Sequence, residues 1–199
     1  DVSLLGSHYG LTGAAVTAYD YLDVGPTTNA SVNARPTTDN RIDFEDLILF
    51  AINYQLVSAP QSAARPVFEA ASADEVSLDR PSVFGADGRM TAHLNLRGTG
   101  MVQGLSLKLT WDPAVVTLES TAPGQMADDL GALVLTGTPG TVDVAMLGVS
   151  SGLQGEGTIA NVTFRRIGPG DPAIALASAD GRDAGNAHVT VAVKTTGVP

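Results

Sequence analysis

The longest part of the chain alternates apolar and polar residues in the way that β-strands do. Apolar side chains stand at every second position from Met90 to Leu96 and again from Leu105 to Trp111. Successive side chains of a strand point to opposite faces, so this pattern predicts strands with one buried and one exposed face. Shorter runs, separated by Gly, Pro and Asp, follow at 142–147, 159–164, 174–176 and 189–193. Such a series is typical of an antiparallel sandwich or jelly roll.

The beginning of the chain has a helical period instead. Residues 1–9 and 46–54 share one pattern, in which an Asp is followed by apolar residues at helical spacing and then by a Tyr. Gly10 follows the first of these segments and suits the position after a helix end. Because short helices bury little surface alone, we expect the two helices to pack together as a pair.

Composition divides the chain into three parts. All four Tyr residues lie within residues 1–54, and a stretch rich in Ala, Pro and Ser precedes the alternating pattern. We therefore predict a helical module at 1–56, a linker at 57–73 and a β-sandwich at 74–199. The predicted fold class is mostly β, with a small α-helical module in front.

Acidic residues gather in the segment TTDNRIDFEDLILFAINY, residues 37–54. A calcium loop of the EF-hand type takes side-chain oxygens at positions 1, 3, 5 and 9, a backbone carbonyl at 7 and a bidentate carboxylate at 12. With Asp46 at position 12, Asp43 falls at 9, the carbonyl of Arg41 at 7 and Asp39 at 5. Asn40 then occupies position 6, where the backbone is left-handed and Asn is tolerated.

The first half of this loop requires an insertion. Uninterrupted counting puts Arg35 at position 1, where a cation would repel the metal. Asp23 suits position 1 if the residues after it are inserted, and oxygens from the insertion would complete the shell. The predicted ion is Ca²⁺, and its predicted ligands are Asp23, Gly25, Asp39, Arg41, Asp43 and Asp46.

A capping interpretation of the same residues stays open. Asp43 and Asp46 have the spacing of a capping pair at a helix start, with Asp39 in a turn before it. Spacing alone does not separate this interpretation from the metal site, and both can hold together.

The segment DNRIDFEDLILFAINY, with DVGPTT before it, resembles dockerin modules over residues 1–56. Asp1 would then be the last ligand of a calcium loop whose other members lie before the chain begins. Because residues 1–10 lack the basic start of a secretory signal, we expect a mature or excised fragment. Dockerins of cellulosomes often carry small hydroxylated recognition residues at loop positions 10 and 11. Phe44 and Glu45 stand there in this chain, so partner specificity does not transfer.

Residues 74–193 resemble a cohesin domain. The resemblance rests on three phrases in order, VSLDRPSVFGADGRMTAHLNL, VQGLSLKLTWDPAVVTLES and GTVDVAMLGVSSGLQGEGTIANVTFR. It implies a nine-stranded jelly-roll sandwich, related to carbohydrate-binding modules, that binds a dockerin on one flat sheet face. It also implies a secreted or cell-surface bacterial protein, with a dockerin or cohesin module as partner in trans or within the same chain.

Charge and composition exclude several classes of function. A net charge of -10 opposes phosphate binding, so we expect no nucleic-acid partner. No apolar stretch approaches the roughly 18 residues of a membrane span, so we expect no membrane insertion. The chain contains no Cys, which rules out disulfides and thiolate metal sites.

Two other functions compete with protein recognition. Hydrolysis would need paired carboxylates or a nucleophile with a base, and no pattern links His8, His93 or His188 to such a group, so we expect a non-enzyme. Sugar binding shares the sandwich, but Trp111 is in phase with the apolar positions before it and is predicted to lie in the core. We therefore predict calcium-dependent protein recognition. The alternative is carbohydrate binding, in which calcium is only structural.

Overall fold

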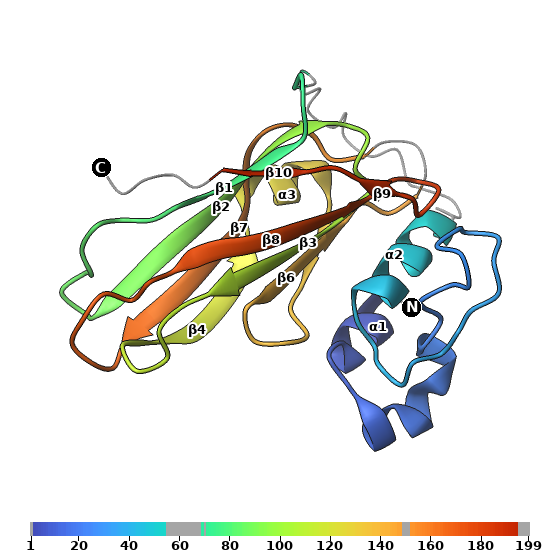
Figure 1. Ribbon diagram of the computed structural model, residues 1–199, viewed down its shortest axis with the longest axis horizontal. Coiled ribbons are helices and arrows are strands. Elements are labelled where there is room, and N and C mark those ends of the chain that lie inside the picture. Colours follow the sequence, from blue (N-terminus) through green and yellow to red (C-terminus); the bar gives the residue numbers. More distant parts are fainter. Residues whose placement is uncertain (1, 55–68, 70, 149–151, 195–199) are drawn as a thin grey trace.

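The computed structural model describes residues 2–54, 69, 71–148 and 152–194, and places a small helical part beside a two-layered β-sandwich (Figure 1). The helical part contains α1 (Val2–His8), the 3₁₀ helix η1 (Gly13–Leu22) and α2 (Phe44–Asn53). Both helices that the sequence predicts are present, whereas η1 was not predicted. Most of the predicted linker at 57–73 lies outside the described residues.

The sandwich consists of two five-stranded sheets, with the strand orders β10-β1-β2-β7-β4 and β5-β6-β3-β8-β9 (Figure 1). A short helix, α3 (Gln125–Leu130), packs against β7. The strands are β1 (Glu75–Asp79), β2 (Arg89–Thr99), β3 (Gly104–Thr110), β4 (Val116–Pro123), β5 (Leu133–Leu135), β6 (Thr141–Ala145), β7 (Gln154–Arg166), β8 (Ala175–Arg182), β9 (His188–Val189) and β10 (Ala192–Lys194).

The alternating pattern does place one face of each long strand in the core. In β2 the buried positions are the apolar ones from Met90 to Leu96, and in β3 they are Leu105, Leu107 and Leu109. These side chains join one apolar cluster between the two sheets. Trp111 is half-buried and packs edge-on against Phe164 of that cluster, with 5.4 Å between ring centroids, as its phase predicted.

The last strands differ from the prediction, which was nine strands in all. The described residues form ten, because the run at 189–193 is divided between the sheets. β9 pairs with β8, whereas β10 pairs in parallel with β1 of the other sheet. The apolar alternation continues through the crossing because both sheets border the same core, and Val189 and Val191 pack against it. Alternation alone therefore cannot show that the strand changes sheet.

The helical part lies against the second sheet. Leu5 of α1, Val16 of η1 and Leu47 and Ala51 of α2 share one cluster with Ala145 of β6. Partly buried Leu133 and Leu135 of β5 pack against the same cluster. The predicted packing of α1 with α2 is therefore extended by the sheet, which supplies the rest of the cluster.

Two glycines allow this close approach. A Cβ added at Gly104 of β3 would lie 2.6 Å from Cδ1 of Ile48 in α2, which is closer than two non-bonded carbon atoms can come. A Cβ added at Gly10, just after α1, would lie 2.5 Å from the carbonyl oxygen of Gly137, in the loop between β5 and β6. Within the described ranges, no helix has the length and apolar character needed to cross a membrane.

Replacing Gly104 with Leu should push α2 away from the sheet, because even the first added carbon overlaps Ile48. We expect the free energy of unfolding to fall by about 1–3 kcal/mol, as for overpacked interiors. Chemical denaturation measures this, and limited proteolysis should show faster cleavage within residues 2–54. Thr110→Leu adds the same side chain at an exposed position of β3 and should do neither. Equal effects of the two variants would contradict the role of Gly104.

Candidate functional site

Asp46 ties the start of α2 to the loop before it. The side chain is 1% exposed, and its Oδ1 accepts hydrogen bonds from the backbone N–H groups of Val24 and Gly25 at 2.7 and 2.8 Å. Its Oδ2 accepts from the N–H of Asp43 at 2.8 Å, and Asp43 in turn accepts from the N–H of Glu45. The two aspartates form a capping box, so the capping interpretation is confirmed. Burial raises the pKa of Asp46 to about 7, although the three N–H donors oppose this shift.

Asp23 makes a second set of such contacts. It is 4% exposed and accepts from the N–H groups of Asp39 and Asn40 at 3.2 and 2.8 Å. Asp39 accepts from the N–H of Arg41 at 3.0 Å. Asn40 has φ of 61°, the left-handed conformation expected for its position in the loop. Asp23 and Asp39 are therefore neighbours in space, as the inserted-loop hypothesis requires.

Ile42, which falls at position 8 of the predicted loop, connects that loop to the end of α1. Its backbone pairs with the residues that follow α1, since Gly10 donates to the carbonyl of Ile42 and Ile42 donates to that of Leu11. Its side chain is fully buried.

Gly25 lies against the start of α2, where a Cβ would come within 2.6 Å of the Glu45 carbonyl carbon.

The side chains predicted to bind calcium are not gathered into one metal-binding group in the described residues. No group of three or more His, Asp or Glu side chains in the described part of the chain could hold a metal ion. Backbone N–H groups donate hydrogen bonds to the side-chain oxygens of these carboxylates, which are Asp23, Asp39, Asp43 and Asp46. Calcium ligation by Asp23, Gly25, Asp39, Arg41, Asp43 and Asp46 therefore stays a prediction from the sequence.

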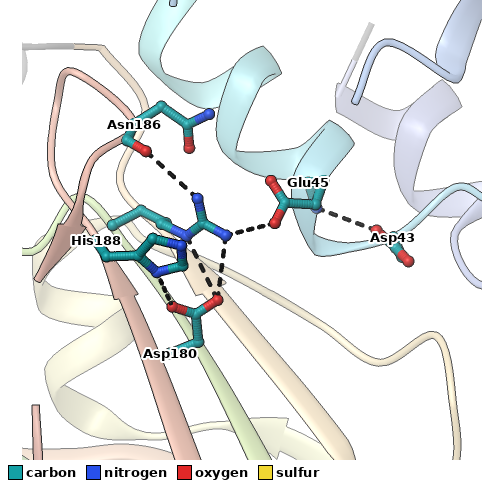
Figure 2. A network of polar contacts seen from close by, with 6 residues as sticks. Asp43, Glu45, Asp180, Asn186 and His188 are labelled. Carbon is teal, nitrogen blue, oxygen red and sulfur yellow. Dashed lines mark hydrogen bonds and ion pairs between the residues drawn. The ribbon is translucent and has the colours of Figure 1, made fainter. Parts of the chain in front are cut away.

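A polar network joins the helical part to the sandwich (Figure 2). Arg182 of β8 is 4% exposed, and its guanidinium forms an ion pair with Glu45 of α2. The same group contacts Asp180 at 3.3 Å and donates to the carbonyl of Asn186 at 3.4 Å. Asp180 also contacts His188 at 2.9 Å. Burial raises the pKa of Glu45, and the Arg182 charge beside it opposes that rise.

A second polar contact across the same boundary involves Tyr9 and Asp143. The Tyr9 hydroxyl donates to Oδ2 of Asp143 in β6 at 2.8 Å. Asp143 is 2% exposed, and burial raises its pKa to about 6. Burial and the neighbouring Asp143 also raise the pKa of Tyr9. Ser106, paired with Asp143 across β3 and β6, lowers the pKa of Asp143, but Oδ1 has no hydrogen-bond partner of good geometry.

Several of these polar residues, though not Arg182, border a cleft of about 280 Å³ between the helical part and the sheet. We call it the seam cleft. Its polar lining consists mainly of carboxyl and hydroxyl groups, from Tyr9, Asp43, Glu45, Ser106, Asp143 and Asp180.

Sequence reasoning found only the α2 side of this site. Tyr9 and Asp143 are separated by 134 residues, and Glu45 and Arg182 by 137, so no local spacing connects them. One signal was present: Asp143 interrupts the apolar run at 142–147, where a carboxylate on a buried strand requires a reason.

Each of the three histidines contacts a neighbouring polar group of the protein. His8 contacts the neighbouring Ser7 hydroxyl and the Leu4 carbonyl, His93 contacts Asn161, and His188 contacts Asp180. The expectation of a non-enzyme stays a prediction.

Asp46→Ala should unfold the loop around α2, because three backbone N–H groups lose their acceptor. We expect a loss of about 2–3 kcal/mol in the free energy of unfolding of the helical part, followed by far-UV circular dichroism. Asp39→Ala removes an exposed acceptor with one bond and should cost less than about 1 kcal/mol. The calcium prediction is tested on the same proteins: calorimetric binding of calcium to the wild type that is weaker in Asp39→Ala, which should stay folded, would support it. No heat of binding would leave Asp46 with its capping role alone.

The pKa of Asp143 predicts how stability depends on pH. Because its pKa is higher in the folded chain (about 6) than in the unfolded chain (about 3.9), the folded state holds the proton more tightly. The added stability is complete below about pH 4 and is lost as the pH rises through about 6, a change of roughly 2–3 kcal/mol. Asp143→Asn should flatten this part of the stability curve, measured by denaturant unfolding at several pH values. Parallel curves for the two proteins would contradict it.

Comparisons with known proteins give a likeness in structure only. No protein-family model matches the chain, and no curated protein is similar to it in sequence. Solved structures similar to it include the sixth cohesin of scaffoldin B from Acetivibrio cellulolyticus, crystallised with a Cel5 dockerin mutant, at 18% identity and a TM-score of 0.46, covering 63% of this chain and 95% of that one. The second type II cohesin module of the ScaA scaffoldin from the same organism is 11% identical, with a TM-score of 0.49, and the match covers 64% of this chain and 95% of that one. A non-cellulosomal cohesin from the archaeon Archaeoglobus fulgidus is 17% identical, with a TM-score of 0.46, and the match covers 61% of this chain and 86% of that one. Likenesses at these values do not by themselves establish the family.

Proposed function

We propose that this chain is a non-catalytic protein-recognition module of the cohesin–dockerin type, acting at the cell surface or outside the cell. In this proposal the β5-β6-β3-β8-β9 sheet binds a dockerin-like helical module, and the chain carries one such module itself. The proposal keeps the calcium dependence expected from the sequence resemblance as a separate part with its own test.

The observation that carries the proposal is the contact between the helical part and this sheet. Its centre is apolar, with Ile48 of α2 over Gly104 and Leu5 in one cluster with Ala145. Its edge is polar, with the Tyr9–Asp143 hydrogen bond and the Glu45–Arg182 ion pair. An apolar centre within a polar rim is the usual anatomy of a protein–protein interface.

Attachment to the same chain explains why this contact can form without very high affinity. A tethered partner has an effective concentration set by the linker, commonly in the millimolar range for short flexible linkers. The same surfaces could then exchange their tethered partner for an equivalent module on another molecule. This exchange is the act of assembly that the proposal assigns to the chain.

Two variants of the full chain test the exchange. Gly104→Leu blocks the sheet and leaves a free helical part, whereas Ile48→Asp places a charge in the buried face of α2 and leaves a free sheet. Each variant alone should be a monomer, and an equimolar mixture should form a heterodimer in light scattering coupled to size-exclusion chromatography. Wild-type chain mixed with either variant is the control, since its surfaces are already occupied.

The outcome separates the two parts of the proposal. A heterodimer that disappears when calcium is chelated supports both, and one that persists supports recognition without calcium. If the mixture stays monomeric while circular dichroism shows that both variants keep their β-sandwich, recognition through this sheet is wrong.

A further inference from the structure

The walls of the seam cleft come from both parts of the chain. Asp43 and Glu45 stand at the start of α2, and Asp143 and Asp180 stand on β6 and β8, facing them across the cleft (Figure 2 shows Asp43, Glu45 and Asp180). The described residues that line the cleft include these four carboxylates and no basic side chain. The cleft therefore forms only when the helical part lies on the sheet.

Asp143 has one carboxylate oxygen that lacks a well-formed hydrogen bond. Its side chain is 2% exposed and lines the cleft, and Oδ1 has no hydrogen-bond partner of good geometry among the described residues, although the Ser106 hydroxyl lies near enough to lower the pKa of Asp143. Oδ2, by contrast, is occupied by the Tyr9 hydroxyl. A buried carboxylate oxygen without a donor is unfavourable, and a ligand that brings a donor removes this cost.

The basic groups nearby neutralise only part of the charge of this site, because their ion pairs in the described residues are with Glu45 and Asp180 and not with Asp43 or Asp143. Arg182 is engaged by Glu45, Asp180 and the Asn186 carbonyl, and it does not line the cleft. His188 contacts Asp180 and is itself mostly exposed. Burial raises the pKa of Asp143, as expected for a carboxyl group removed from water.

We propose that the seam cleft binds the basic side chain of a protein partner, a Lys ammonium or Arg guanidinium group that donates to Oδ1 of Asp143. The hydroxyls of Ser106 and Tyr9 beside it offer further acceptors for such a group. Glu45 and Asp180 have side-chain exposures of 27% and 41%, so the cleft is open to an incoming side chain. The net charge of -10 attracts a basic partner over a longer range.

An organic cation suits this cleft better than a metal ion. A hard divalent ion needs several oxygens converging at short range, and no three acidic or His side chains of the described residues are grouped to hold one. An ammonium or guanidinium group accepts more widely spaced partners, because its donors point in several directions. The proposal goes beyond the docking of the two parts and does not depend on their exchange between molecules.

The test uses the full chain and two small probes. Nα-acetyl-lysine amide carries the ammonium group, and Nα-acetyl-norleucine amide has an uncharged side chain of similar length. In a ¹H–¹⁵N NMR titration, the lysine probe should give saturable shifts at Tyr9, Ser106 and Asp143, and the norleucine probe should give none. Saturable shifts with both probes, or with neither, would overturn the proposal.

Variants separate recognition in the cleft from general attraction to an acidic chain. Asp143→Asn should weaken lysine-probe binding by about fivefold or more. Thr138→Lys places an ammonium group in the cleft itself and should abolish binding, whereas Thr136→Lys, at an exposed position outside the cleft, should leave most of it. Because Thr138 is exposed, this pair keeps the test decisive even if Asp143→Asn does not fold.

A calcium titration tests whether the cleft binds a metal ion instead of an organic cation. Calcium chloride added to the probe complex should leave the shifts at Ser106 and Asp143 in place. Displacement of the probe by calcium, with saturable shifts at the same residues, would make the cleft a metal site and overturn the proposal. Undiminished binding of the probe to Thr138→Lys would overturn it as well.

Discussion

The short helices depend on the sheet for burial, and this constraint shapes the whole N-terminal part. α1 has seven residues and α2 has ten, and helices of this length are marginal in water when isolated. α2 buries seven of its ten residues, far more than one face of a helix can supply. It therefore has to lie between two layers: α1 and η1 form one, and β3 and β6 form the other. The sandwich has its own apolar cluster between its sheets and has no such requirement.

The polar contacts at this boundary determine position more than they add stability. Removing Arg182, Glu45 and Asp143 from water is costly, and a buried ion pair returns little more than its desolvation cost. Each pair is satisfied in only one placement of the helical part on the sheet, however, because one member comes from the helical part and the other from the sheet. The apolar cluster favours contact, and the Tyr9–Asp143 and Glu45–Arg182 contacts select the arrangement.

What the sequence could predict follows from the range of each interaction. The alternation from Met90 to Leu96 depends on neighbouring residues, and so does the capping box of Asp43 and Asp46, and the structure contains both. The crossing at 190–191 depends instead on which strands lie beside β9 and β10, and alternation carries no information about that. Arg182 and Asp143 escaped prediction for the same reason, because their partners lie more than a hundred residues away. The repeat of the α1 pattern in α2 did predict the helix pair but gave no sign of the sheet that completes it.

The division of the seam cleft between two parts of the chain has a thermodynamic consequence. Asp43 and Glu45 belong to the helical part, whereas Ser106, Asp143 and Asp180 belong to the sheet. A ligand that contacts both walls binds the docked chain and not the separated one, so its binding free energy is added to the free energy of docking. The coupling between docking and ligand binding is reciprocal. A change that makes docking less favourable therefore lowers the affinity for the ligand by the same factor. A partner's basic side chain in this cleft would therefore hold the helical part on the sheet and slow its exchange with a module on another molecule.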